Sequence, residues 1–318
     1  MASTEATGST GPRVLLLDTA SLYFRAFFGV PDSLRAPDGT PVSAVRGLLD
    51  FIARLVTDYS PSHLVCCWDN DWRPAWRVEL VPTYKEHRLA AGPDGEPIDQ
   101  EEVPGALAAQ VPIITRVLTA MGIPIVGVDG YEADDVIGTL ATKADMPVEV
   151  VTGDRDLFQL VDDARGVRVL YTARGVGRHE QVTGEVVRAK YGVAPGAYAD
   201  FATLRGDASD GLPGVKGVGD KTAARLLADY GDLAGIRAAA LDETSALAAG
   251  VRARLLAAAD YLDKAPRVVA VARDLPIPND WGELRRPHAF ADEAEVTRLA
   301  QTWGLGGSVT RIAAALAG

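Results

Sequence analysis

Several short apolar runs, three of them followed by an acid, constrain the fold more than any other feature of this chain. Runs that are too short to span a membrane and rich in Val, Leu and Ile are typical of strands buried in a parallel sheet. We expect strands at 13–18, 64–69, 123–128, 148–152 and 167–171. Amphipathic patterns between them predict helices at 43–59, 111–121 and 132–144. This alternation predicts an α/β domain with a mainly parallel central sheet flanked by helices.

Acidic residues follow three of these expected strands, at the edge where open α/β sheets carry their sites. Others occupy the motifs Glu132-Ala133-Asp134-Asp135, Gly153-Asp154-Arg155-Asp156 and Gly206–Asp210. Taken singly, each acid fits an ordinary loop or helix start. Taken together they are costly, because two carboxylates about 5 Å apart repel by about 3 kcal/mol at an effective dielectric near 20. The candidate set is Asp18, Asp69, Glu132, Asp134, Asp135, Asp154, Asp156, Asp207 and Asp210.

Oxygen ligands without a cluster of His or Cys favour Mg²⁺ or Mn²⁺, and a pair of such ions is suited to phosphodiester cleavage. The net charge of −11, from 43 acids and 32 bases, argues on its own against a polyanionic partner. If nine acids converge on bound cations, however, the remaining charge is only about −2. The dispersed histidines argue against a zinc site. The adjacent Cys66 and Cys67 predict buried thiols in a reducing cytoplasm.

After about residue 200 the pattern becomes helical, which predicts two parts: an α/β domain at 13–200, after a loose tail at 1–12, and a helical region at 201–318. A closing helix is expected at 309–316. The Gly-rich stretch 214–222 resembles a phosphate-binding P-loop, but Asp220 stands where that motif needs lysine. A helix–hairpin–helix-like element at 206–230 fits better, and such an element binds duplex backbone without reading sequence. Its candidate contacts are Lys216, Gly217, Gly219, Lys221 and Thr222.

Six motifs in this order resemble the 5′-nuclease family, which comprises the flap endonucleases and the 5′-nuclease domain of bacterial DNA polymerase I. They are DTASLYFR from Asp18, CWD at Asp69, YKEHR at 84–88, GYEADD at 130–135, TGDRD at 152–156 and GDASDGLPGVKGVGDKT at 206–222. The resemblance covers most of residues 13–240. Since no polymerase or proofreading segment follows, we expect a stand-alone bacterial enzyme.

The resemblance implies a PIN-like sheet, a helical arch near 77–110 and a C-terminal helix–three-turn–helix region. It implies that the nine acids hold two or more Mg²⁺ or Mn²⁺ ions, and that K⁺ can bind the hairpin. Lys85 and Arg88 match the pair that contacts the scissile phosphate, Arg25 matches a nearby basic residue, and Tyr84 is expected to stack near the substrate end.

The function implied is that of a 5′-3′ exonuclease and flap endonuclease in replication and repair. Its partners would be DNA with a 5′ flap, a free 5′ end or a junction, and transient replication or repair proteins. It would act as a monomer in the cytoplasm, associated with the nucleoid.

The chain also departs from the family pattern. The stretch after Asp69 is one residue longer than usual, which makes Asp71 a rival for its role, although we favour Asp69 because it directly ends the strand. Gly211 stands where Asn is common, Thr19-Ala20-Ser21 replaces the usual turn, and 92–102 is acidic where single-stranded DNA would pass. Two other functions remain open, a PIN-type ribonuclease and a non-catalytic junction-binding protein.

Overall fold

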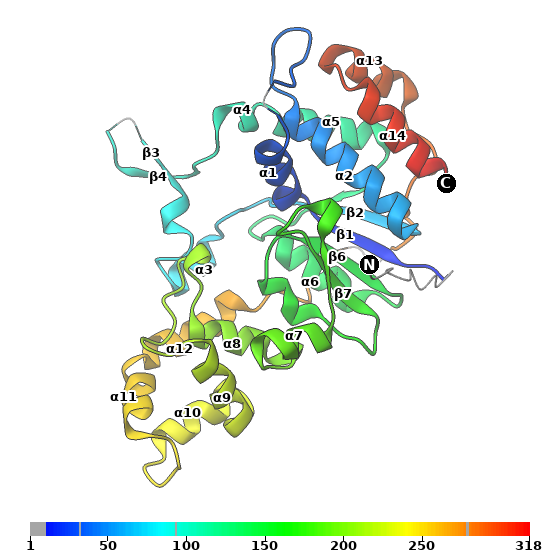
Figure 1. Ribbon diagram of the computed structural model, residues 1–318. Coiled ribbons are helices and arrows are strands. Elements are labelled where there is room, and N and C mark those ends of the chain that lie inside the picture. The colour runs from blue at the N-terminus through cyan, green and yellow to red at the C-terminus, as the bar shows by residue number, and fades with distance from the viewer. Residues whose placement is uncertain (1–10, 32, 93, 278–279) are drawn as a thin grey trace.

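A computed structural model describes residues 11–31, 33–92, 94–277 and 280–318, and a six-stranded sheet forms its centre (Figure 1). Most of the tail expected at 1–12 lies outside the described residues. The strand order is β5-β2-β1-β6-β7-β8, parallel except between β7 and β8. The strands are β1 (Val14–Asp18), β2 (His63–Cys67), β5 (Ile125–Val126), β6 (Val148–Thr152), β7 (Val167–Tyr171) and β8 (Glu180–Val182). The mainly parallel sheet predicted from the apolar runs is confirmed, and β8 is an antiparallel addition.

The two faces of the sheet contribute to two separate hydrophobic clusters. Val14 and Leu16 of β1 point into one cluster, and Leu15 and Leu17 point into the other. This alternation follows from the two-residue period of a strand. It also separates the adjacent cysteines, because Cys66 and Cys67 face opposite clusters, and both are buried, free thiols.

Helices cover both faces of the sheet, and the acid-rich start of one of them is directed toward its carboxyl edge. One face carries α1 (Thr19–Gly29), α2 (Ser43–Tyr59) and α5 (Val111–Met121), and the other carries α6 (Ala133–Lys143). Glu132 caps α6 and forms a capping box with Asp135. Acids are favoured in this first turn because the N-terminal end of a helix carries partial positive charge.

The segment expected to form a helical arch is largely not helical. It contains the short helices α3 (Ala75–Leu80) and α4 (Gly105–Ala108), and a hairpin of β3 (Leu89–Ala91) with β4 (Pro97–Glu101). Figure 1 shows this hairpin projecting from the body of the molecule. The Gly, Pro and acidic residues at 92–104 are typical of a loop, and β4 was not among the expected strands. Gly95 adopts a φ of 84° and allows the chain to reverse within the hairpin.

A helical region follows the sheet and packs below it in Figure 1. Its helices are α7 (Gly184–Tyr191), α8 (Tyr198–Arg205), α9 (Asp220–Tyr230), α10 (Leu233–Leu241), α11 (Ala249–Ala257) and α12 (Ala259–Val269). Their buried residues join the cluster on the α6 face of the sheet. The helical region and that face therefore share one continuous core. None of the helices among the described residues is long and apolar enough to cross a membrane.

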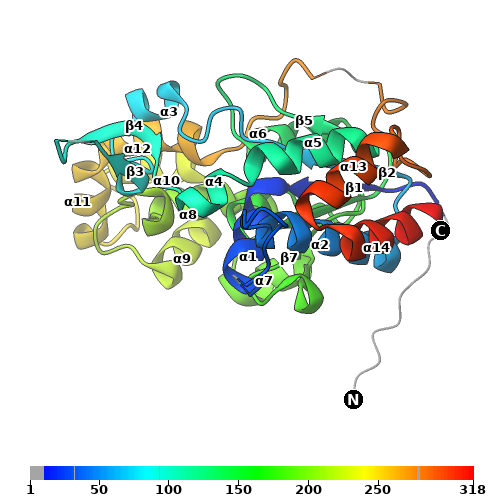
Figure 2. The same cartoon turned by 90° about the horizontal axis from the view of Figure 1, so that it is seen from above.

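The last two helices do not belong with the helical region, which corrects the expected boundary at 201–318. α13 (Glu293–Trp303) and α14 (Gly306–Ala317) return to the opposite side of the molecule and pack against α5 and α2 (Figure 2). Their apolar residues, including Leu299 and Ile312, complete the cluster on the α2 face, and Arg311 pairs with Asp50 of α2 at 2.8 Å. The closing helix expected at 309–316 is present within α14.

Candidate metal and nucleic-acid site

A cavity of about 640 Å³ opens at the carboxyl edge of the sheet. The ends of β1 and β6, the start of α6, the arch and the loop after α8 all contribute to its lining. Six of the nine candidate acids line it: Asp18, Asp69, Glu132, Asp134, Asp154 and Asp207. Glu101 and Glu102 of the arch also line it, and no sequence motif singled them out. Lys85 and Arg88 face the same space.

Asp18 and Asp134 show how strongly this edge concentrates negative charge. Asp18 accepts hydrogen bonds from the Ser21 amide at 3.1 Å and from Thr152 Oγ1 at 2.7 Å. Burial, Asp69 and Asp154 nevertheless raise the pKa of Asp18 to about 7. Burial, Asp18 and Asp154 raise the pKa of Asp134 well above its usual value. Neither carboxylate has a basic partner in the described residues, so both ionise at a high energetic cost.

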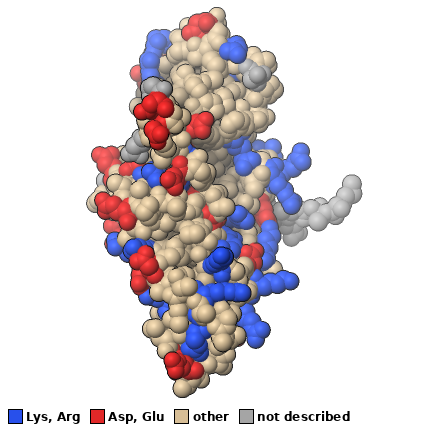
Figure 3. Space-filling view, turned by 90° about the vertical axis from the view of Figure 1, so that its left-hand side faces the viewer, with Lys and Arg blue, Asp and Glu red and all other residues tan. Residues whose placement is uncertain are grey.

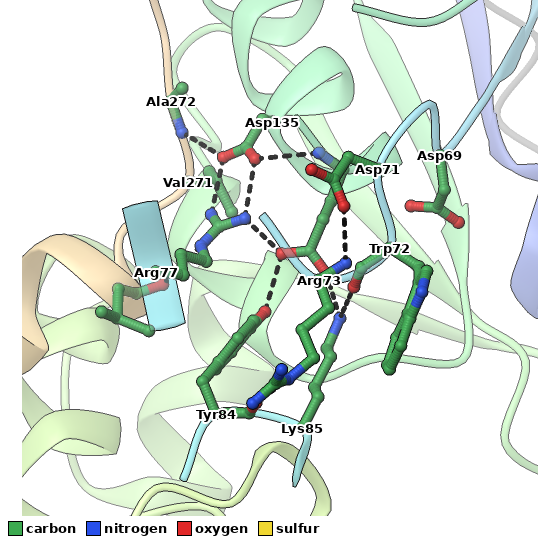
Figure 4. A network of polar contacts seen from close by, with 12 residues as sticks. Asp69, Asp71, Trp72, Arg73, Arg77, Tyr84, Lys85, Asp135, Val271 and Ala272 are labelled. Atoms are coloured by element: carbon green, nitrogen blue, oxygen red, sulfur yellow. Dashed lines mark hydrogen bonds and ion pairs between the residues drawn. The ribbon is translucent and has the colours of Figure 1, made fainter. Parts of the chain in front are cut away.

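Asp69, not its rival Asp71, reaches the cavity. Asp69 Oδ1 accepts a hydrogen bond from the Ala133 amide at 2.7 Å, and burial raises its pKa. Asp71 Oδ1 instead accepts from the Arg73 amide at 3.1 Å and does not line the cavity (Figure 4).

Asp156 lies behind the cavity wall, next to Asp154. Asp154 Oδ1 accepts a hydrogen bond from the Asp156 amide at 2.8 Å. Asp156 Oδ1 is buried and has no hydrogen-bond partner among the described residues. Burial and the neighbouring carboxylates of Asp154 and Asp210 raise the pKa of Asp156. A buried carboxylate oxygen without a partner is a strong acceptor that a cation, a proton or a bound water can satisfy.

The loop after α8 carries two acids that do have basic partners. Asp207 pairs with Arg205 at 3.1 Å, and Asp210 pairs with Arg88 at 2.9 Å. Burial raises the pKa of Asp210 to about 6, although Lys85 and Arg88 oppose that rise. The Asp210 carbonyl also accepts from the Lys85 amide at 2.9 Å. The loop is therefore attached to the base of the arch.

Lys85 lies at the base of the arch in a strained backbone conformation, with a φ of 48°. Its Nζ forms an ion pair with Glu132. Burial alone would raise the pKa of Glu132, but Lys85 and Arg77 outweigh burial and keep it below its usual value. The Lys85–Glu132 ion pair therefore connects the base of the arch to the start of α6.

Tyr84 is not placed for the expected stacking near the substrate end. Its side chain is buried, with only 3% of its surface exposed, and its hydroxyl donates to Glu132 Oε2 at 2.7 Å. The ring contacts the cations of Arg77 and Lys85 instead. The reason is the turn before Lys85, which directs residue 84 into the core and residue 85 toward the cavity.

Arg77 is a site-forming residue that the sequence motifs did not reveal. Its guanidinium is buried and forms ion pairs with both Glu132 and Asp135. Figure 4 shows the pair with Asp135. Asp135 consequently has both oxygens occupied and does not line the cavity. Arg77 directly follows Trp76 in the sequence, but nothing local indicated its partners.

Arg25 lies next to the cavity without lining it. Its Nη1 donates to the Ala173 carbonyl at 3.3 Å, and its buried Nε has no partner among the described residues. Arg25 Nη2 lies close to Gly153, the residue before Asp154: a Cβ built on Gly153 would lie 3.4 Å from this nitrogen. The guanidinium therefore stands directly beside the acid-bearing loop.

The candidate hairpin contacts lie apart from the acid cavity, between α8 and α9. Lys216 and Gly217 line a separate groove of about 650 Å³ together with Arg254 of α11. Gly219 caps α9, and Lys221 and Thr222 lie in its first turn. Lys216, Gly217, Gly219 and Lys221 are exposed, and Thr222 is half-buried. Figure 3 shows basic side chains gathered over one side of this lower part of the molecule, with acids mainly along the other edge.

The cavity does not contain a preformed metal cage. Within the described residues, no three or more Asp, Glu, His or Cys side chains are grouped closely enough to hold an ion as they stand. The electrostatics still fit a cation, because several buried carboxylates lack positive partners and Asp156 Oδ1 has no hydrogen bond. Carboxylates that repel one another are expected to lie apart until a cation draws them together.

Comparisons with known proteins match the chain in two parts. Residues 13–192 match the family model of the 5′-3′ exonuclease N-terminal resolvase-like domain, and residues 193–291 match that of the 5′-3′ exonuclease C-terminal SAM fold. A 5′-3′ exonuclease of Streptomyces coelicolor is 61% identical over 302 residues, which is 94% of this chain and 98% of that protein.

Two further comparisons extend this result. A DNA polymerase I of Mycobacterium bovis is 38% identical over 86% of this chain, but the match spans 29% of that longer protein. The flap endonuclease of bacteriophage T5, solved as a pseudo-enzyme–product complex with DNA and metal ions, superposes with a TM-score of 0.60 at 17% identity. That superposition covers 96% of this chain and all of the phage chain.

Proposed function

Because this chain belongs to the 5′-3′ exonuclease family, we propose that it degrades DNA from 5′ ends and also cuts 5′ flaps near their junction with duplex. The observation that carries this proposal is the cavity in which uncompensated buried carboxylates face Lys85 and Arg88. Such a cavity suits a phosphodiester, because its acids can hold cations and its bases can contact phosphate oxygens.

Two or more divalent ions, Mg²⁺ or Mn²⁺, are the cofactors that fit this site. The ions would be held from the strand side by Asp18, Asp69, Asp134 and Asp154. Asp156 would contribute from behind the cavity wall, and Asp207 and Asp210 from the loop after α8. Glu132 and Asp135 would act from the start of α6, where Arg77 already holds both of them. When bound, the ions acidify the attacking water and neutralise charge on the phosphodiester and the leaving oxygen. The phage flap endonuclease of the same fold, solved with DNA and metal ions, supports this assignment.

The basic residues of the arch would orient the phosphate. Lys85 forms an ion pair with Glu132, and Arg88 forms one with Asp210. A phosphate that entered the cavity would compete with these two carboxylates for the bases. Once Lys85 and Arg88 contacted the phosphate in place of the carboxylates, they would stabilise the negative charge that grows on the phosphate oxygens as the bond breaks. Arg25 would add a third positive charge beside Gly153.

The hairpin would hold the duplex while the cavity acts on the single strand. Exposed Lys216 and Lys221, with the amides of Gly217 and Gly219 at the start of α9, offer contacts to a phosphate backbone. A K⁺ ion bound there would add to these contacts. The DNA polymerase I relatives favour replication and repair in the bacterial cytoplasm as the setting, and a monomer would suffice for this arrangement.

The test is cleavage of a 5′-flap DNA labelled at each end in turn, with Mg²⁺, Mn²⁺ or EDTA. Cuts at the 5′ end and near the junction, present with metal and absent with EDTA, would support the proposal. Asp69→Asn should abolish them, and Asp71→Asn, which alters a neighbour outside the cavity, should not. Preferential cleavage of an RNA flap would favour the ribonuclease alternative, and tight junction binding without cleavage would favour a binding protein.

A further inference from the structure

Arg77 joins three parts of the molecule through one buried guanidinium. It belongs to α3, at the base of the arch, and only 3% of its side chain is exposed. It forms ion pairs with Glu132 and Asp135 at the start of α6. Its Nε donates to the Val268 carbonyl at the end of α12, at 3.2 Å.

Asp135 extends this connection. Arg77 Nη1 and Nη2 donate to Asp135 Oδ2 and Oδ1 at 2.9 and 2.8 Å, and the Ala272 amide donates to Oδ1 at 2.8 Å. The chain returning from the helical region is thus attached to the acid-bearing helix and to the arch base (Figure 4). A planar guanidinium forms such a fork, whereas an ammonium group cannot.

Three side chains donate to Glu132, and only one of them is suited to leave. Arg77 and the buried Tyr84 hydroxyl hold Oε2, and Lys85 holds Oε1 from the cavity side. If Arg77 and Tyr84 did not contact Glu132, the movement of Lys85 to a phosphate would leave the Glu132 carboxylate buried and unpaired. Burying an unpaired charge is energetically costly. With Arg77 in place, Glu132 stays paired and Lys85 can be exchanged.

We propose that Arg77 is a positioning residue for cleavage: it fixes Glu132 and thereby allows Lys85 to pass from Glu132 to the substrate phosphate. Arg77 does not line the cavity and would act through Lys85. This inference rests on the proposed nuclease function and adds to it a residue outside the cavity lining.

The decisive experiment is a double-mutant cycle between Arg77→Lys and Lys85→Ala on the full chain, measured as single-turnover cleavage of a 5′-flap DNA. Arg77→Lys keeps the charge and loses the fork, so we expect a rate loss of about 10- to 100-fold. In the Lys85→Ala background the same substitution should cost less than about threefold, because the residue through which it acts is gone. Flap DNA binding in EDTA should change less than about threefold.

The matched control is Arg168→Lys. Arg168 makes an equally bidentate pair with buried Glu149, at 2.6 and 2.7 Å, between β7 and β6 and outside the cavity. Its substitution should lower the melting temperature with little change in rate. Should Arg77→Lys fail to fold, Tyr84→Phe replaces it, since that variant removes only the hydroxyl bond to Glu132. Tyr84→Phe should lower the cleavage rate less than Arg77→Lys does. In the Lys85→Ala background, Tyr84→Phe should have no further effect on the rate.

The outcomes are distinguishable. Rate losses that multiply in the double variant would overturn the inference, as would an unchanged rate in folded Arg77→Lys or a loss explained by weaker DNA binding. A wild-type protein that binds the flap without cutting it would instead reject the proposed function, and the inference with it.

Discussion

The two sides of the acid cavity are built in opposite ways. On the strand side, Asp18, Asp134 and Asp156 form no ion pair within the described residues, and their pKa values are raised. On the arch side, Glu132 and Asp210 are paired with Lys85 and Arg88. Both sides are buried, so the difference comes from the partners and not from solvent.

This contrast separates two functions of a carboxylate. Acids without partners are destabilising until a cation arrives, so they are suited to hold metal ions. Acids with basic partners keep those bases in place near the cavity, so they are suited to deliver Lys85 and Arg88 to a phosphate. Replacing residues on each side should therefore affect activity, metal response and stability in different ways.

The largest effect is expected on the strand side. Asp134→Asn removes a carboxylate from the centre of the uncompensated group, and cleavage should fall by on the order of 10³-fold or more. The rise in melting temperature caused by Mg²⁺ should shrink with it. Wild-type metal dependence in this variant would remove Asp134 from the proposed ligands.

On the arch side, Lys85→Ala should lower the cleavage rate by about 10²- to 10³-fold while the metal response survives. Glu132 retains Arg77 and Tyr84 as partners, so the acid cavity should stay intact. The measurement is single-turnover cleavage beside a thermal titration with Mg²⁺. An unchanged rate would remove the proposed role of Lys85.

Stability in EDTA should change in opposite directions on the two sides. Glu132→Gln leaves Arg77 and Lys85 without a shared carboxylate and should lower the free energy of unfolding by about 3 kcal/mol. Asp156→Asn removes an uncompensated buried charge and should raise it. Chemical denaturation of both variants measures this contrast, and changes of the same sign would contradict it.

The contact between the arch and the loop after α8 can be tested at Gly211. Gly211 has a φ of 69°, and a Cβ there would lie 2.0 Å from the Thr83 carbonyl oxygen. Gly211→Ala should cost about 2 kcal/mol of stability and slow cleavage, because Thr83 and Lys85 must shift. Gly250→Ala in α11 is the control, since a Cβ there would meet no atom of the described residues within 4 Å and its helix gains from alanine.

The smallest effect concerns pH. The folded-state pKa of Asp18 is raised from 3.8 to about 7, so the unfolded chain releases this proton first as pH rises. Stability in EDTA should therefore fall between about pH 4 and pH 7, where the folded state still holds the proton. Mg²⁺ pairs with the ionised carboxylate, so it should raise the melting temperature more near pH 7.5 than near pH 5.5. An equal rise at both values would count against the strand-side group as a cation site.

The sheet and most of the acid positions could be predicted because they depend on local patterns. Apolar runs place Asp18 and Asp154 at strand ends, and the parallel topology then brings them to one edge. Which acids have basic partners and which have none could not be predicted. Arg77 meets Asp135 across 58 positions of sequence, and Lys85 meets Glu132 across 47, so neither pairing leaves a local pattern.

β4 and α13 were missed for other physical reasons. β4 is short and polar and is held by pairing with β3, so its composition resembled a loop. α13 has a strong N-cap in Asp292, which accepts from the Glu295 amide at 2.9 Å, but its narrow apolar face is covered by α5 and α14, which lie elsewhere in the sequence. In both cases a partner outside the element decides the structure, and the composition of the element itself allows alternatives.

The packing of α14 against α2 also has a consequence for how the protein is made. The apolar face of α2, with Leu48 and Ile52, leaves the ribosome well before α14, the helix that completes its core. Such distant contacts form slowly, and the exposed face favours aggregation meanwhile. A nascent chain stalled before α13 should therefore depend on chaperones, and premature termination there should yield insoluble protein.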